Sequence, residues 1–119
     1  MARRSRAYLL DIRTATDLIA RFTAACSFDE FAADPLLHSA VERQLEIIGE
    51  ALRQLAKADP AVVAQISDFR RIIALRNILI HGYAKVDHQI IWDIVQQHVP
   101  ILRREVDALL AEPDGSSEA

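Results

Sequence analysis

The segment RNILIHGY, residues 76–83, places four polar side chains inside one of the most apolar stretches of the chain. They are Arg76, Asn77, His81 and Tyr83. An arginine presents a planar, permanently charged fork that matches a phosphate group, and a histidine exchanges protons near neutral pH. Burying such groups without partners costs about 1–3 kcal/mol each. Their presence here therefore indicates either a functional site or other side chains of the fold that pair with them.

One reaction that these residue types can perform is the cleavage of RNA. The 2′-hydroxyl of RNA is a built-in nucleophile, so cleavage needs a base for that hydroxyl, an acid for the leaving oxygen and positive charge at the phosphate. Two sets of Arg76 and His81 would supply all three. The sequence contains no HxH, HExxH or CxxC pattern, so we expect neither a metal ion nor another cofactor.

Spacing alone leaves a structural alternative open. Arg76 would then pair with a buried glutamate such as Glu46 or Glu50. His81 would be a helix-end cation favoured by the helix dipole, and Tyr83 would be a half-buried core aromatic. Which alternative holds depends on the helices that position these side chains.

Residues 69–81 are expected to form the helix that carries most of these groups. At about 100° per residue, Arg76 lies on a different side of a regular helix from Asn77 and His81. The arginine and the histidine can still meet if the helix ends or bends near Gly82, or if a second copy of the chain adds its own pair across a two-fold axis. A symmetric homodimer would also bury the flanking isoleucine and leucine side chains, which would explain why this helix is apolar nearly all round.

Helical periodicity extends over most of the remaining chain. Further helices are expected over residues 5–25, 35–57, 60–65 and 88–110. Asp34-Pro35 and Asp59-Pro60 are helix-start signals, and Pro100 should kink or split the last helix. The predicted fold is all-α, an up-and-down bundle of four longer helices plus short ones. One helical domain is predicted over residues 1–111, followed by a disordered acidic tail over 112–119.

Two features of the helix over residues 35–57 indicate neighbours. Gly49 costs about 1 kcal/mol relative to alanine in a helix interior, which a close approach of another helix would explain. Glu42, Glu46 and Glu50 recur at four-residue intervals. They form either a solvated face or a strip that pairs with arginines.

Predictions for other side chains follow from the same periodicity. The buried stripe of the first helix is expected to be Tyr8, Ile12, Ala15, Ile19, Phe22 and Cys26. On the last helix, His98 is expected in the core or an interface, whereas His88 is expected to be exposed. No partner can be identified for His38.

Composition narrows the class of protein. The chain has 119 residues, of which 51% are hydrophobic, so one domain with an aliphatic core is expected. Its single cysteine, Cys26, excludes an intramolecular disulfide and favours a reducing, cytoplasmic compartment. No apolar run approaches the roughly 18–20 residues of a membrane span. The net charge of −3 does not itself predict nucleic-acid binding. Contact with RNA would therefore need a local group of basic side chains, and the candidates for guiding RNA are Arg70, Arg71 and Lys85.

Two stretches carry a resemblance to a known family. The run LRNILIHGYAKVD…IIWDIVQQHVPIL, residues 75–102, resembles the HepT-like branch of the HEPN superfamily. The run AVERQLEIIGEALRQL, residues 40–55, resembles the central helix of that branch. The family motif is arginine, four residues, histidine, one residue, tyrosine. It falls on Arg76, His81 and Tyr83, with the polar residue that follows the arginine present as Asn77.

The resemblance implies a dimeric helical bundle with metal-independent endoribonuclease activity that leaves a 2′,3′-cyclic phosphate. Arg76, His81 and Asn77 would be the catalytic residues, and RNA, tRNA included, the substrate. It further implies the toxin of a type II-like HEPN/MNT toxin–antitoxin pair. The minimal nucleotidyltransferase (MNT) antitoxin would transfer AMP to Tyr83, adding bulk and negative charge beside the cleft. The alternative is a non-catalytic binding module that docks the nucleotidyltransferase and presents Tyr83.

Overall fold

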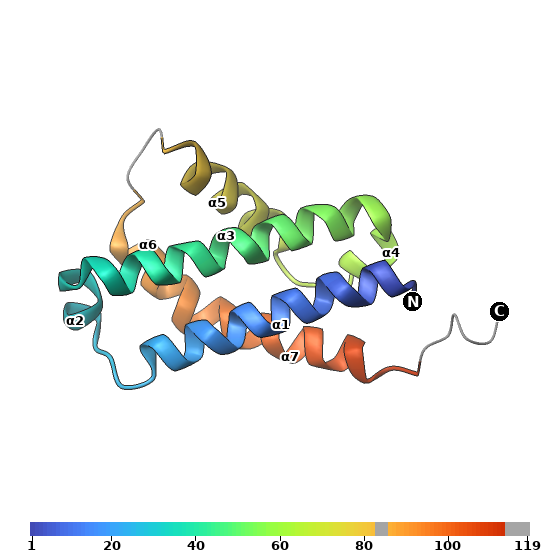
Figure 1. Ribbon diagram of the computed structural model, residues 1–119, viewed down its shortest axis with the longest axis horizontal. Coiled ribbons are helices and arrows are strands. Elements are labelled where there is room, and N and C mark those ends of the chain that lie inside the picture. Colours follow the sequence, from blue (N-terminus) through green and yellow to red (C-terminus); the bar gives the residue numbers. More distant parts are fainter. Residues whose placement is uncertain (83–85, 114–119) are drawn as a thin grey trace.

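Helices form every regular element in residues 1–82 and 86–113, which are the residues that the computed structural model describes (Figure 1). The all-α prediction is confirmed. The elements are α1 (Arg3–Thr23), α2 (Phe28–Ala33), α3 (Pro35–Ala58), α4 (Pro60–Val63), α5 (Phe69–His81), α6 (His88–Asp93), the π-helical turn η1 (Ile94–His98) and α7 (Val99–Ala111). No helix in the described ranges is long and apolar enough to cross a membrane.

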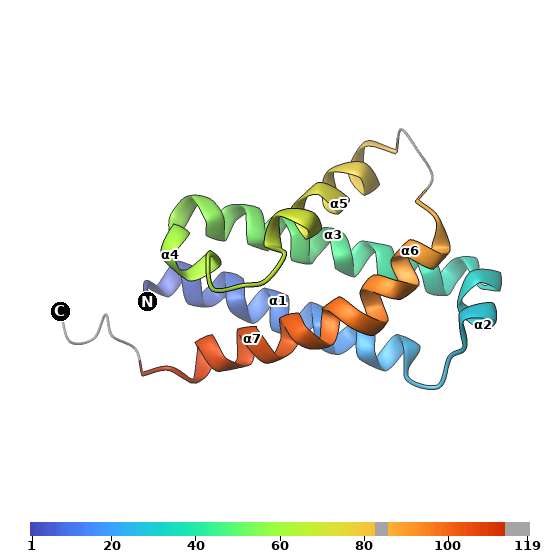
Figure 2. The same cartoon turned by 180° about the vertical axis from the view of Figure 1, so that it is seen from behind.

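The long helices α1 and α3 lie side by side and form the centre of the molecule (Figures 1 and 2). α7 packs against α1, and α5 packs against α3. The core between them is aliphatic, with Leu9, Ile12, Leu45, Ile48 and Leu52 almost completely buried. α3 is therefore the element through which α5 is attached to the rest of the fold.

The predicted helix starts are confirmed. The carboxylate of Asp34 accepts hydrogen bonds from the backbone N–H groups of Leu36 and Leu37 at 3.1 and 3.2 Å, at the start of α3. Asp59 accepts one from the N–H of Val62 at 3.4 Å, at the start of α4. Each carboxylate satisfies donors that the first helical turn leaves without an intrahelical acceptor.

The buried face of α1 differs from the predicted stripe. Phe22 is 37% exposed and Tyr8 is only half-buried, so the prediction was wrong there. The face instead includes Leu9 and three hydroxyl residues, Ser5, Thr16 and Thr23. Apolar periodicity missed the hydroxyl residues. They can be buried because each donates a hydrogen bond to a carbonyl or carboxylate oxygen.

Pro100 splits the last helix, as predicted. The break takes the form of a π-helical turn, η1, in which the N–H of Val99 donates to the carbonyl of Ile94 five residues earlier. Proline has no N–H to donate, so the wider turn accommodates it while the chain continues as α7. Ile94 and Val99 stay buried on either side of the turn.

α5 crosses α3 at Gly49, which has no side chain to hold the two helices apart. A Cβ atom built at Gly49 would collide with the Cβ of Arg76 and would lie 2.9 Å from its Cγ and 3.1 Å from the carbonyl oxygen of Ile72. The close approach that was predicted from the sequence is therefore confirmed, and the residue that uses it is Arg76.

Replacing Gly49 with alanine tests this crossing. Helix propensity alone would stabilise the variant by about 1 kcal/mol. We expect the opposite sign, a loss of about 1–3 kcal/mol, because the new methyl group displaces α5. The measurement is the free energy of unfolding in urea. The matched control is Ser39→Ala at an exposed site of α3, expected to change stability by less than about 0.5 kcal/mol. A Gly49→Ala protein as stable as the parent would contradict the packing described.

Candidate active site

The helix that carries the predicted site projects from the body of the protein. In Figures 1 and 2 the C-terminal end of α5 extends beyond the other helices. Only Ile72 and Leu75 of α5 are buried. Ile78 and Ile80 are 46% and 43% exposed, so the last turns of α5 present apolar side chains to solvent.

Arg76 forms an ion pair with Glu50, the residue that follows Gly49 on α3. Nη2 of Arg76 lies 2.9 Å from Oε1 of Glu50, and Nη1 donates to Oδ1 of Asn77 at 2.9 Å. Glu46 instead pairs with Arg43 at 3.3 Å. The predicted pairing of Arg76 with a glutamate is therefore confirmed, and its partner is Glu50. Glu46 and Glu50 each pair with arginines, so these two glutamates form an arginine-pairing strip.

Glu50 is held by more than one partner. Arg53 donates to both of its carboxylate oxygens, at 3.0 and 3.1 Å, and Gln54 donates to Oε2 at 2.8 Å. The hydrogen bonds from Arg53 and Gln54, together with the charges of Arg53 and Arg76, lower the pKa of Glu50 to about 2, against the opposing effect of burial. Glu50 is therefore ionised throughout the pH range in which enzymes work.

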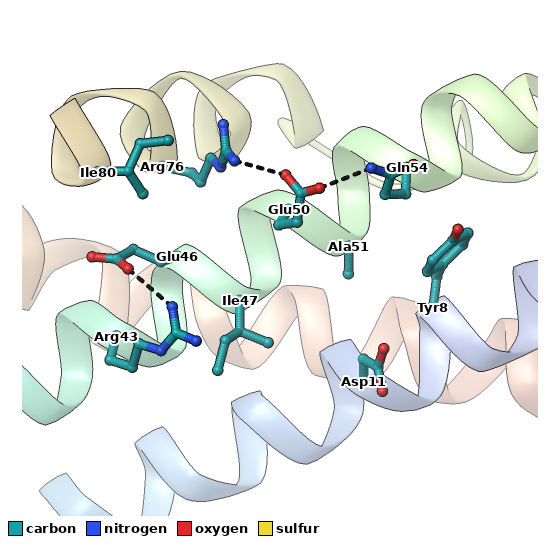
Figure 3. Close-up of a pocket in the computed structure, with 10 residues that line it drawn as sticks. All are labelled: Tyr8, Asp11, Arg43, Glu46, Ile47, Glu50, Ala51, Gln54, Arg76 and Ile80. Atoms are coloured by element: carbon teal, nitrogen blue, oxygen red, sulfur yellow. Dashed lines mark hydrogen bonds and ion pairs between the residues drawn. The ribbon is translucent and has the colours of Figure 1, made fainter.

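The Arg76–Glu50 pair forms one wall of a cavity of about 270 Å³ between α1, α3 and α5 (Figure 3). The lining residues are Tyr8, Asp11, Arg43, Glu46, Ile47, Glu50, Ala51, Gln54, Arg76 and Ile80. The Arg76 side chain remains 20% exposed. Its guanidinium is thus partly buried at the edge of a surface depression, where it can meet a ligand.

Within one copy, the helix does not aim Arg76 and His81 at the same point. α5 is regular from Phe69 through His81 and ends only at Gly82, whose φ is +66°. Five residues of regular helix rotate a side chain by about 140° from its starting direction. The chain therefore leaves the helical path only after His81, so no bend of the helix brings His81 to the side of Arg76. Asn77 contacts Arg76, and His81 is exposed at the helix end.

The two arginines predicted to guide RNA lie near the start of α5. Both Arg70 and Arg71 are exposed. The guanidinium of Arg70 stacks 4.7 Å from the centre of the Phe69 ring. Nη1 of Arg71 lies 3.4 Å from Nε2 of His98. They are not brought next to His81 by the fold of one copy.

Two predicted residues cannot be placed. Tyr83 and Lys85 lie outside the described residues. Their predicted roles in AMP acceptance and RNA guidance stay predictions.

The sequence did not predict that two histidines would lie next to each other. The ring centres of His38 on α3 and His88 on α6 lie 4.3 Å apart, and each of the two rings makes a T-shaped contact with Phe31. His88 was predicted to be exposed and is half-buried instead, because it packs into this aromatic cluster. Neither helix carries a local signal for the pairing, since the two residues are distant in the chain.

No three histidine, cysteine, aspartate or glutamate side chains gather as metal ligands in residues 1–82 and 86–113. What the described residues of the site offer is a positioned guanidinium, an amide beside it and an imidazole at the helix end. These groups can bind an anion and transfer protons.

Comparisons with known proteins agree on one family. A family model described as Ribonuclease HepT-like matches residues 12–109. A Thermococcus cleftensis protein named "Probable ribonuclease HepT" is 35% identical over 92% of this chain and 98% of its own length. A Methanocaldococcus jannaschii protein, provisionally named as an RNase, is 36% identical over 95% of this chain and 93% of its own length. No solved structure matches the chain significantly.

Proposed function

The chain belongs to the Ribonuclease HepT-like family, and we propose that it is a metal-independent endoribonuclease whose active site lies between two copies of the chain. The observation that carries the proposal is the placement of Arg76. A permanently charged guanidinium stands at the edge of an open cavity, fixed from two sides by Glu50 and Asn77. That arrangement suits the binding of an RNA phosphate.

The geometry of α5 supports a site shared by two copies. Arg76 and His81 leave different sides of one regular helix, so one copy does not bring them to a single phosphate. Ile78 and Ile80, next to them, are exposed apolar residues that a second α5 would cover. A two-fold contact uses the same surface on both copies. It would place the His81 of each copy across from the Arg76 of the other.

The proposed reaction is an internal transfer of the phosphate. One His81 accepts the proton of the RNA 2′-hydroxyl, and the 2′-oxygen forms a bond to phosphorus. The bond from phosphorus to the 5′-oxygen breaks, and the partner's His81 donates a proton to that oxygen. The products are a 2′,3′-cyclic phosphate and a 5′-hydroxyl end. Arg76 stabilises the charge that develops on the phosphate, and Asn77 orients Arg76 through their hydrogen bond. Arg70, Arg71 and Lys85 would guide the RNA backbone.

Variants of the two motif residues test this reaction. We expect His81→Ala and Arg76→Ala each to slow cleavage of tRNA by about 10²- to 10⁴-fold, because each removes a proton carrier or the phosphate ligand. The measurement is the rate of cleavage by the purified chain with a chelator present, with the cyclic phosphate end identified by mass spectrometry.

Arg104→Ala is the matched control. Arg104 is exposed on α7 and does not line the cavity, so near-parental activity is expected. Cleavage at the parental rate by the purified His81→Ala protein would rule out the role assigned to that histidine.

We further propose that the enzyme is the toxin of a toxin–antitoxin pair and that AMP transfer to Tyr83 by an MNT-type antitoxin silences it. The proposal is supported by family membership and by the position of Tyr83 two residues after His81. The phosphate of AMP would add negative charge beside Arg76 and repel RNA.

Incubation with a minimal nucleotidyltransferase and ATP tests the modification. We expect the mass of the chain to rise by one AMP or more, all of it lost in Tyr83→Phe, and RNA cleavage to stop in step with the modification. The same mass gain in Tyr83→Phe would contradict the assignment. AMP addition to a chain that never cleaves RNA would favour the non-catalytic binding module instead.

A further inference from the structure

We infer that Glu50 is a positioning residue of the ribonuclease site, which holds the guanidinium of Arg76 in place for the phosphate. The inference rests on the proposed function and deepens it. It assigns a role to a residue of α3, outside the motif on α5.

The first argument is the place of the contact. Glu50 follows Gly49, where the backbone of α3 comes closest to Arg76. The arginine side chain starts at the crossing of the two helices and reaches Glu50, with Nη2 2.9 Å from Oε1. Both ends of the ion pair are thus carried by helices that pack against each other.

The second argument is that Glu50 is itself immobilised. Arg53 and Gln54, three and four residues further along α3, bind both of its oxygens. The carboxylate is therefore fixed by its own helix, independently of Arg76. A group that is held in this way can define the position of a mobile arginine, because little further ordering is needed when the pair forms.

The third argument is that Glu50 and Asn77 occupy only some of the N–H donors of the guanidinium. A guanidinium carries five N–H groups. One on Nη2 faces Glu50 and one on Nη1 faces Asn77, and the described residues supply no acceptor for the others. Glu50 and Asn77 therefore fix the orientation of the fork and leave N–H groups that can bind phosphate oxygens at the same time.

The test is a double-mutant cycle between Glu50→Gln and Arg76→Ala, read as the single-turnover rate of tRNA cleavage. We expect Glu50→Gln to slow cleavage by about 10- to 100-fold, since a displaced catalytic group typically costs that much. In the Arg76→Ala background the same change should alter the rate by less than about twofold, because Glu50 acts through Arg76. A residue with only a structural role would slow both backgrounds equally.

Glu30→Gln is the control for the loss of a carboxylate charge, since Glu30 is exposed on α2 and does not line the cavity, and glutamine can still accept the hydrogen bond from the Ser27 N–H. It should leave the rate within about twofold of the parent. Circular dichroism and the unfolding midpoint, measured for each variant, confirm that the assay temperature lies within the folded range.

Glu50→Asp covers the case in which Glu50→Gln does not fold. It keeps the charge but shortens the side chain, so it should also slow the Arg76 enzyme and leave the Arg76→Ala enzyme unchanged. Parental activity in the Glu50 variants, or equal slowing in both backgrounds, would overturn the inference. A parental chain that does not cleave RNA at all would instead overturn the proposed function.

Discussion

The ion pair between Arg76 and Glu50 is the interaction on which the candidate site depends. It forms where α5 crosses α3 at Gly49, and Arg76 is the residue whose Cβ occupies the space that Gly49 leaves. A charged side chain that begins at a helix crossing must be paired, because a partly buried charge without a partner is costly. Glu50 provides the pairing, and in the proposed mechanism the same contact would determine where the guanidinium meets a phosphate.

The rest of the fold supports that crossing through packing and ion pairs. α3 packs against α1 through an aliphatic core that is almost fully buried. α1 is in turn tied to α7 by ion pairs of Arg103 with Asp17 and of Arg13 with Asp107. α5 thus rests on one side of a fixed platform. Because only Ile72 and Leu75 of α5 enter the core, the apolar end of α5 stays exposed, and this is the surface that the proposed dimer would bury.

Local features of the fold could be predicted from the sequence, whereas pairings across helices could not. Aspartate caps and proline breaks act within a few residues, so Asp34, Asp59 and Pro100 gave correct helix boundaries. Gly49 correctly predicted a close approach. The choice between Glu46 and Glu50 as the partner of Arg76 depends on how α5 lies across α3, which no local pattern encodes.

The same reason explains the other differences. The contact between the rings of His38 and His88 joins helices that are distant in the chain. In α1, Thr16 and Thr23 are buried because their hydroxyl groups bond to nearby backbone carbonyls, and a pattern of apolar residues does not register such bonds. The motif itself was evident from the sequence. What the structure adds is that α5 is straight through His81, which favours a site shared between two copies.

The central claim is that an Arg76 and a His81 from different copies act on one phosphate, and subunit mixing tests it most directly. The parental chain is mixed with an excess of an Arg76→Ala/His81→Ala double variant until nearly every parental chain lies in a mixed dimer, as verified by native mass spectrometry, and RNA cleavage per parental chain is measured. A shared site predicts that this rate falls by about 10²-fold or more, because no Arg76 in a mixed dimer then faces a His81 of the other copy. Mixed dimers that cleave at the parental rate per parental chain, as a complete site within each copy would allow, would contradict the account.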